Sequence, residues 1–141
     1  MSSMPRKILF LCTGNSCRSQ MAEGYANALG GGRIVAKSAG IEAHGKNPRA
    51  IKVMQEDGVN ISAQESTMVT DKILSWADLL ITVCGHADEN CPAVSSNLER
   101  QHWPFDDPAK AKGSEEEIMR EFRRVRDSIK QKITENLESE A

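Results

Sequence analysis

A cysteine, an arginine and a serine stand close together in one short segment near the start of the chain. The segment reads CTGNSCRS over residues 12–19. A loop of this kind between a strand and a helix points its backbone N–H groups at one spot, and the helix dipole adds positive potential there. The planar fork of Arg18 can pair two oxygens of a tetrahedral anion. We therefore expect an oxyanion to bind to Thr13, Gly14, Asn15, Ser16, Cys17, Arg18 and Ser19.

Cys12 would lie at the floor of this loop. Cationic neighbours and a helix N-terminus favour the thiolate over the thiol, and the Ser19 hydroxyl can donate to the sulfur. These features predict that Cys12 is a nucleophile. The alternative is a buried cysteine that ends a core strand and is followed by an ordinary turn, since a bare C-x5-R occurs often by chance. Cys17 is expected to be a small packed side chain at the helix start.

Two aspartates precede a proline in the sequence Asp106-Asp107-Pro108. A nucleophile that attacks a tetrahedral oxyanion must expel an oxygen, which leaves more readily once it is protonated. Pro108 biases Asp107 towards extended geometry and can so aim its carboxylate over the anion loop. We predict that Asp107 is the general acid, and the alternative is a turn or helix-cap aspartate. Asp106 is expected to be a supporting or surface group.

Two further cysteines, Cys84 and Cys91, flank a polar segment that contains a glycine. Cys84 ends a predicted strand at the same sheet edge as Cys12. Disulfide exchange needs a thiolate that reaches a sulfur already bonded elsewhere, so a relay is allowed in which Cys84 attacks Cys12 and Cys91 then attacks Cys84. The alternative is a metal site that adds His86 and His102. The spacing disfavours it, because it is not C-x2-C and the histidines form no ligand pair.

The apolar periodicity predicts the elements that position these groups. Buried strands are expected at 8–12, 33–38 and 79–83, with a short strand near 101–103. Helices are expected at 19–29, at 48–57 after an Asn47 cap, and at 71–76 after a Thr70 cap. A capping box, Ser114-x-x-Glu117, opens a long final helix. Residues 84–113 are loop-rich, and the part between Cys84 and Cys91 should be mobile. The alternation predicts an α/β fold, doubly wound, with a four-stranded parallel sheet, helices on both faces and the Cys12 loop at a switch point.

Length and charge limit the remaining classes. A chain of 141 residues suits one domain over residues 1–141, and we expect a monomer. The formal net charge of −2 gives no reason to expect affinity for nucleic acid or for an anionic membrane. The apolar run at the N-terminus is too short for a signal-peptide core, so we expect a cytoplasmic protein with reduced cysteines.

The segments described above resemble the thioredoxin-coupled arsenate reductases, which share the fold of the low-molecular-weight protein tyrosine phosphatases. CTGNSCRSQMAE at 12–23 is shared with the phosphatases, whereas the C-x6-C at 84–91 and HWPFDDPA at 102–109 are specific to the reductases. SAGI at 38–41 and HGKNPRA at 44–50 match as well. The resemblance implies arsenate as substrate and thioredoxin as reductant. It implies Cys12 as nucleophile, Arg18 as the anion-binding arginine, Asp107 as acid, and Cys84 and Cys91 as relay thiols.

The resemblance also implies a potassium ion near the loop, because some members bind one at positions that match Asn15, Glu23 and Ser38. A further acidic ligand of those members falls at Thr67 here. The alternative function is a phosphatase that hydrolyses phosphate monoesters, in which the cysteine pair would have no task. We expect weak phosphatase activity in either case, because loop, arginine and acid suffice for it. A third interpretation is an anion-binding module in which Cys12 is structural.

Overall fold

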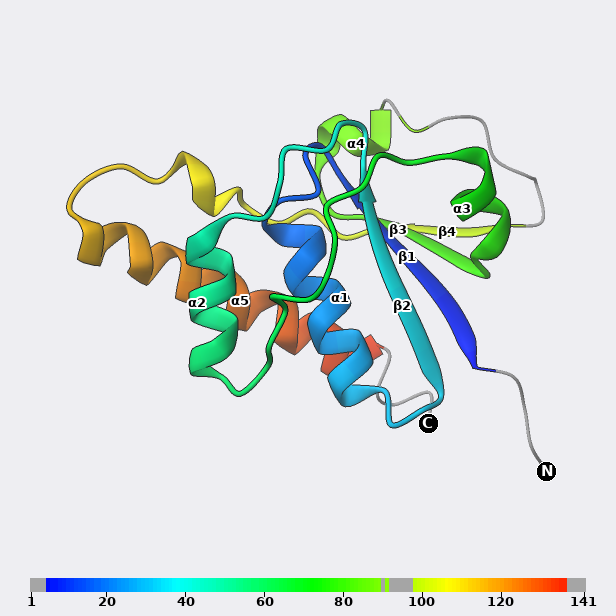
Figure 1. Ribbon diagram of the computed structural model, residues 1–141, viewed down its shortest axis with the longest axis horizontal. Coiled ribbons are helices and arrows are strands. Elements are labelled where there is room, and N and C mark those ends of the chain that lie inside the picture. The colour runs from blue at the N-terminus through cyan, green and yellow to red at the C-terminus, as the bar shows by residue number, and fades with distance from the viewer. Residues whose placement is uncertain (1–4, 90, 92–97, 137–141) are drawn as a thin grey trace.

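The computed structural model describes residues 5–89, 91 and 98–136, and its centre is a parallel sheet (Figure 1). The four strands lie in the order β2-β1-β3-β4, and all neighbours pair in parallel. The chain passes from β1 to β2 on one side and later to β3 on the other, so the order reverses at β1. Ligands bind beyond the carboxyl ends of strands at such a switch point. The strands are β1 (Arg6–Cys12), β2 (Ile34–Gly40), β3 (Leu79–Thr82) and β4 (Glu99–His102).

The two central strands are buried on both faces. Residues 8–12 of β1 are at most 3% exposed, and all of β3 is completely buried. These strands were predicted from continuous apolar runs, which are typical of strands that are covered on both faces. Helices α1 (Arg18–Leu29) and α5 (Glu115–Asn136) lie on one side of the sheet and α3 (Asp71–Trp76) on the other (Figure 1). The predicted α/β fold with helices on both faces is confirmed.

Three helices begin where the sequence predicts a cap. The side-chain oxygens of Asn47 and Thr70 accept backbone N–H bonds of 2.8 Å and 3.2 Å at the starts of α2 (Pro48–Glu56) and α3. Ser114 and Glu117 exchange two N–H bonds of 3.1 Å at the start of α5, which is the predicted capping box. Across residues 5–89, 91 and 98–136, no helix has the length and apolarity needed to cross a membrane.

A short helix, α4 (Gly85–Glu89), follows β3 where the sequence predicts a loop. The Ala87 side chain is completely buried, and its N–H donates to the Cys84 sulfur at 3.4 Å. Five residues are too few to carry a helical period, so this helix depends on its contacts with β1 and β3. The predicted mobility of the segment between Cys84 and Cys91 concerns residue 90 as well, which lies outside the described residues.

Candidate active site

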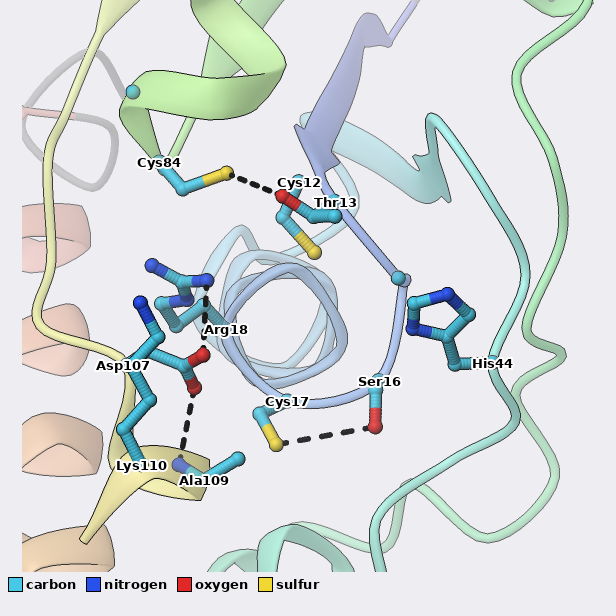
Figure 2. Close-up of a pocket in the computed structure, with 12 residues that line it drawn as sticks. Cys12, Thr13, Ser16, Cys17, Arg18, His44, Cys84, Asp107, Ala109 and Lys110 are labelled. Atoms are coloured by element: carbon cyan, nitrogen blue, oxygen red, sulfur yellow. Dashed lines mark hydrogen bonds and ion pairs between the residues drawn. The ribbon is translucent and has the colours of Figure 1, made fainter.

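The carboxyl ends of β1 and β3 border a pocket of about 520 Å³, at the predicted switch point (Figure 2). It brings together four residues that the sequence singles out from three distant segments: Cys12, Arg18, Cys84 and Asp107. Cys91 is partly buried and does not line this pocket. Among the described residues, the pocket is lined by Cys12, Thr13, Gly14, Ser16, Cys17, Arg18, His44, Cys84, Gly85, Asp107, Ala109 and Lys110.

Cys12 ends β1 with its side chain almost fully buried. The Ser19 hydroxyl oxygen lies 2.9 Å from the Cys12 sulfur, and Asn15 Nδ2 donates to the same oxygen at 2.9 Å. Because this oxygen already accepts a proton from Asn15, the hydroxyl proton of Ser19 can point to the sulfur. A sulfur that receives an O–H bond is stabilised as the thiolate.

The loop contains one residue with left-handed backbone and one glycine that a side chain approaches closely. Asn15 has a φ of 50°, in the left-handed region that asparagine tolerates better than most residues, and its side chain is completely buried. Its Oδ1 accepts the Thr67 N–H at 2.7 Å, so both ends of the amide are bonded. At Gly14, an added Cβ would stand 2.3 Å from Nδ1 of His44, whose ring packs against the loop (Figure 2). The loop is therefore built for a fixed shape.

Arg18 and Asp107 lie next to each other at the pocket (Figure 2). Arg18 Nη2 is 3.6 Å from Asp107 Oδ2, and Nη1 donates to the Phe105 carbonyl at 3.1 Å. Asp107 Oδ1 accepts the Ala109 N–H at 3.0 Å and so caps a 3-10 turn over Pro108–Lys110. The aspartate thus has the capping role that was the alternative, and it also faces the pocket. Asp106 pairs with Arg124 on α5 at 2.8 Å, a supporting position outside the pocket lining.

Cys84 lies between β3 and α4 and is 5% exposed. Its sulfur is 3.3 Å from the Thr13 hydroxyl, a residue of the anion loop. The Ala87 N–H donates to the same sulfur from α4. A thiolate at Cys84 would accept both bonds, which stabilise negative charge on the sulfur. The arrangement links the second cysteine directly to the loop that holds the first.

The comparison with known proteins agrees with this geometry. The chain matches the family described as low molecular weight phosphotyrosine protein phosphatase over residues 7–140. The chain belongs to this family. An arsenate reductase from Halalkalibacterium halodurans is 56% identical over 131 residues, which cover 92% of this chain and 94% of the relative.

Solved structures of the phosphatase family have the same fold. A structure described as an arsenate reductase in the phosphate binding state has a TM-score of 0.78 at 33% identity, covering 96% of this chain and 98% of its own. The tyrosine phosphatase Wzb from Escherichia coli K30 in complex with sulphate reaches 0.80 at 21% identity, over 98% and 100% of the two chains. The second likeness concerns the fold alone. The expected resemblance is therefore confirmed.

Cys17, the other cysteine of the family loop, differs from Cys12 in its chemistry. The pKa of Cys17 is raised to about 12, mainly by burial. The hydrogen bond with the Ser16 hydroxyl lowers this pKa, but by less than burial raises it, and the negative charge of Asp107 acts in the same direction as burial. Cys17 is therefore a thiol near neutral pH and a poor nucleophile. This agrees with the prediction of a packed side chain, although the residue also lines the pocket.

Of the histidines in the alternative metal site, only the side chain of His102 is described, and it does not line the pocket that contains Cys84. His102 lies on β4, where its Nδ1 is 2.8 Å from the Thr82 hydroxyl. The side chain of His86 lies outside what the structure describes. In the described part of the chain, no group of three or more His, Cys, Asp and Glu residues could hold a metal ion.

The positions implied for potassium form one hydrogen-bonded group beside the loop. Ser38 donates its hydroxyl to Glu23 Oε1 at 2.5 Å, and the Thr67 hydroxyl donates to the Ser38 carbonyl at 3.2 Å. Thr67 also bonds to Asn15, as described above. Burial raises the pKa of Glu23, and the Ser38 bond opposes this rise. Carboxylate, amide and carbonyl oxygens are the hard donors that suit a hard cation, so the group fits such an ion.

Sequence reasoning missed three residues around the site. His44 has no role in the predicted site, yet its ring packs against Gly14. Lys110 lines the pocket beside Asp107. Gln20 is completely buried beneath the loop. The sequence does show a polar side chain, Gln20, directly before the apolar Met21 at the start of a predicted helix. It does not show that Gln20 is buried or which groups it contacts.

Proposed function

We propose that this protein reduces arsenate to arsenite, with Cys12 as nucleophile and with Cys84 and Cys91 as relay thiols that thioredoxin regenerates. The observation that carries the proposal is the position of Cys84. It lines the same pocket as Cys12, Arg18 and Asp107, and hydrolysis of a phosphate ester has no use for a second thiol there. Further support comes from the relatives, whose names describe them as arsenate reductases.

In the first step, the Cys12 thiolate attacks the arsenic(V) atom of arsenate. An arsenic–sulfur bond forms, and one hydroxyl leaves as water after it takes a proton from Asp107. Arg18 and the N–H groups of the loop hold the remaining oxygens, whose charge they neutralise. The Ser19 hydroxyl, 2.9 Å from the sulfur, can donate a hydrogen bond to the attacking thiolate.

In the second step, the Cys84 thiolate attacks the sulfur of Cys12. A disulfide forms, the arsenic–sulfur bond breaks, and its electron pair stays on arsenic, which departs as arsenite. The Thr13 hydroxyl and the Ala87 N–H both bond to the Cys84 sulfur and stabilise the attacking thiolate. Attack requires that the adduct on Cys12 remain within reach of Cys84, and the position of both cysteines in one pocket supports this step.

In the third step, Cys91 attacks Cys84 and releases Cys12 as a thiolate. The two electrons that arsenic gained are then balanced by a disulfide between Cys84 and Cys91. Thioredoxin would reduce this disulfide and return both thiols. Because Cys91 does not line the pocket and α4 lies between the two cysteines, this segment must rearrange during the cycle.

The proposal is tested by a coupled assay with purified protein, thioredoxin, thioredoxin reductase and NADPH. We expect NADPH oxidation that depends on arsenate and on thioredoxin, with one NADPH consumed for each arsenite released. Glutaredoxin with glutathione in place of thioredoxin should support little turnover. Efficient hydrolysis of an aryl phosphate without arsenate-dependent NADPH oxidation would contradict the proposal.

Hydrolysis of phosphate monoesters is the second candidate, favoured by the family and by the loop, arginine and acid that both reactions share. Asp107 would protonate the leaving alcohol, and water would release phosphate from Cys12. We propose this as a weak side activity, because the buried Cys84 beside the loop is then unused. An aryl phosphate in the same preparation measures it directly.

We also propose that a potassium ion binds beside the loop, held by oxygens of Asn15, Glu23 and Ser38. The ion would supply positive charge facing the Glu23 carboxylate. We expect potassium chloride to raise the melting temperature above that in choline chloride of equal concentration, by roughly 2–4 °C per 1 kcal/mol of binding free energy. Glu23→Gln keeps an acceptor for Ser38 and should remove the difference. Equal melting temperatures of the wild-type protein in both salts would contradict this site.

A further inference from the structure

The anion loop is held from outside through its carbonyl groups. Four of them accept backbone N–H bonds of 2.8–3.1 Å from the segment that follows β2. The Asn15 carbonyl lies between the last two of these, and its donor is a side chain, Nε2 of Gln20, at 3.1 Å. The backbone pairs are Ile41 to Cys12, Glu42 to Thr13, His44 to Gly14 and Asn47 to Ser16.

Gln20 is fixed in one orientation by its other partners. It is completely buried on α1, and its Nε2 also donates to the Glu65 carbonyl at 2.9 Å. Its Oε1 accepts from Gln64 Nε2 at 2.8 Å. Both amide protons and the amide oxygen therefore have partners, and a flip of the amide would break all three bonds. A buried side chain with this many bonds holds whatever it contacts.

The contact with Asn15 decides the direction of one loop N–H. In a planar trans peptide, the carbonyl and the following N–H point in opposite directions, and the described residues contain no cis peptide. Because the Asn15 carbonyl points to Gln20, the Ser16 N–H points away from Gln20, and Ser16 lines the pocket (Figure 2). The opposite orientation of this peptide would turn a carbonyl oxygen towards the pocket, where it would repel an anion.

We propose that Gln20 is a positioning residue for oxyanion binding, which acts by holding the Asn15–Ser16 peptide so that the Ser16 N–H faces the anion. The inference rests on the proposed function only in naming arsenate as the anion that is held. Inorganic phosphate is a tetrahedral anion that does not oxidise the cysteines, so it serves as the probe. The role of Gln20 can then be tested even if the protein does not reduce arsenate.

The test is a titration of the full 15N-labelled chain with inorganic phosphate, followed by amide chemical shifts. In the wild-type protein the Ser16 amide should move strongly as phosphate binds. Gln20→Met keeps the length and loses the donor, so the dissociation constant should rise about ten- to hundredfold and the Ser16 shift should largely vanish. Gln64→Met is the matched control, because it removes a bond to Gln20 and leaves the bond to Asn15.

Each outcome bears on the inference. Phosphate affinity in Gln20→Met equal to that of Gln64→Met, or an unchanged Ser16 response, would overturn it. A loss of melting temperature shared by both variants, with loss of affinity in Gln20→Met alone, would support it. If Gln20→Met does not fold, the wild-type titration still decides, because a Ser16 amide that ignores phosphate would refute the proposed direction of this N–H. A wild-type protein that binds phosphate as expected but reduces no arsenate would contradict the proposed function and leave this inference intact.

Discussion

Replacing Cys84 with serine should stop arsenate reduction and leave aryl phosphate hydrolysis close to the wild-type rate. The serine hydroxyl can still bond to Thr13, so the loop should keep its shape. It cannot displace arsenic from the Cys12 sulfur, because a neutral alcohol is a far weaker nucleophile than a thiolate. We expect thioredoxin-linked turnover to fall by on the order of 10⁴-fold, while hydrolysis changes by less than about threefold.

The two activities of one preparation act as each other's control. Cys12→Ser should lose both, because both reactions start at the same sulfur. A Cys84→Ser protein that loses hydrolysis together with reduction would point to damage of the pocket and not to a missing relay thiol. Sustained arsenate-dependent NADPH oxidation by Cys84→Ser would show that arsenite can leave without attack by Cys84, and the proposed second step would be wrong.

Much of the fold could be predicted because its signals are local. The apolar run of β1 has no polar face, which is possible only between two covering layers, and this layer pattern defines the fold class. Helix starts were accurate at Asn47, Thr70 and Ser114, since a capping side chain bonds to residues within its own first turn. Helix α4 lacked such a signal, because its five residues become helical through contacts that are distant in the chain.

The candidate site divides in the same way. Cys12 and Arg18 could be predicted because the loop that joins them is one continuous segment, and Asp107 could be added because a proline follows it. The bonds that hold the loop rigid come from elsewhere. Some come from backbone N–H groups after β2, such as that of Glu42, and a backbone donor cannot be recognised from the type of its residue. Another comes from the buried amide of Gln20, whose partners are set only by the folded chain.

The disulfide between Cys84 and Cys91 would have to form across α4, which lies between them in the chain. A disulfide requires two Cα atoms within about 7 Å of each other. In a helix that ran from Cys84 to Cys91, seven residues would advance by about 10 Å, beyond the reach of a disulfide. Because α4 covers only Gly85–Glu89, we expect the relay to bend the chain after α4 or to unwind this helix in part. A short helix that relies on tertiary contacts, with Ala87 as its buried residue, can do so at little cost.

Replacing Cys91 with serine should therefore allow about one turnover and no more. Arsenate would still form the adduct on Cys12, and Cys84 would still release arsenite, since both line the pocket and neither step needs Cys91. The resulting disulfide between Cys12 and Cys84 would then persist, because the wild-type structure keeps both sulfurs almost fully buried and hence away from thioredoxin.

The measurement combines a burst of arsenite, expected at about one equivalent per protein chain, with peptide mass mapping of the spent enzyme under non-reducing conditions. The map should contain the Cys12 and Cys84 peptides joined together. The wild-type protein stopped by acid during turnover should instead contain joined Cys84 and Cys91 peptides, because its relay continues to the last thiol. Sustained thioredoxin-linked turnover by Cys91→Ser would show that thioredoxin reduces the Cys12–Cys84 disulfide directly. The relay would then end at Cys84, and Cys91 would have no part in it.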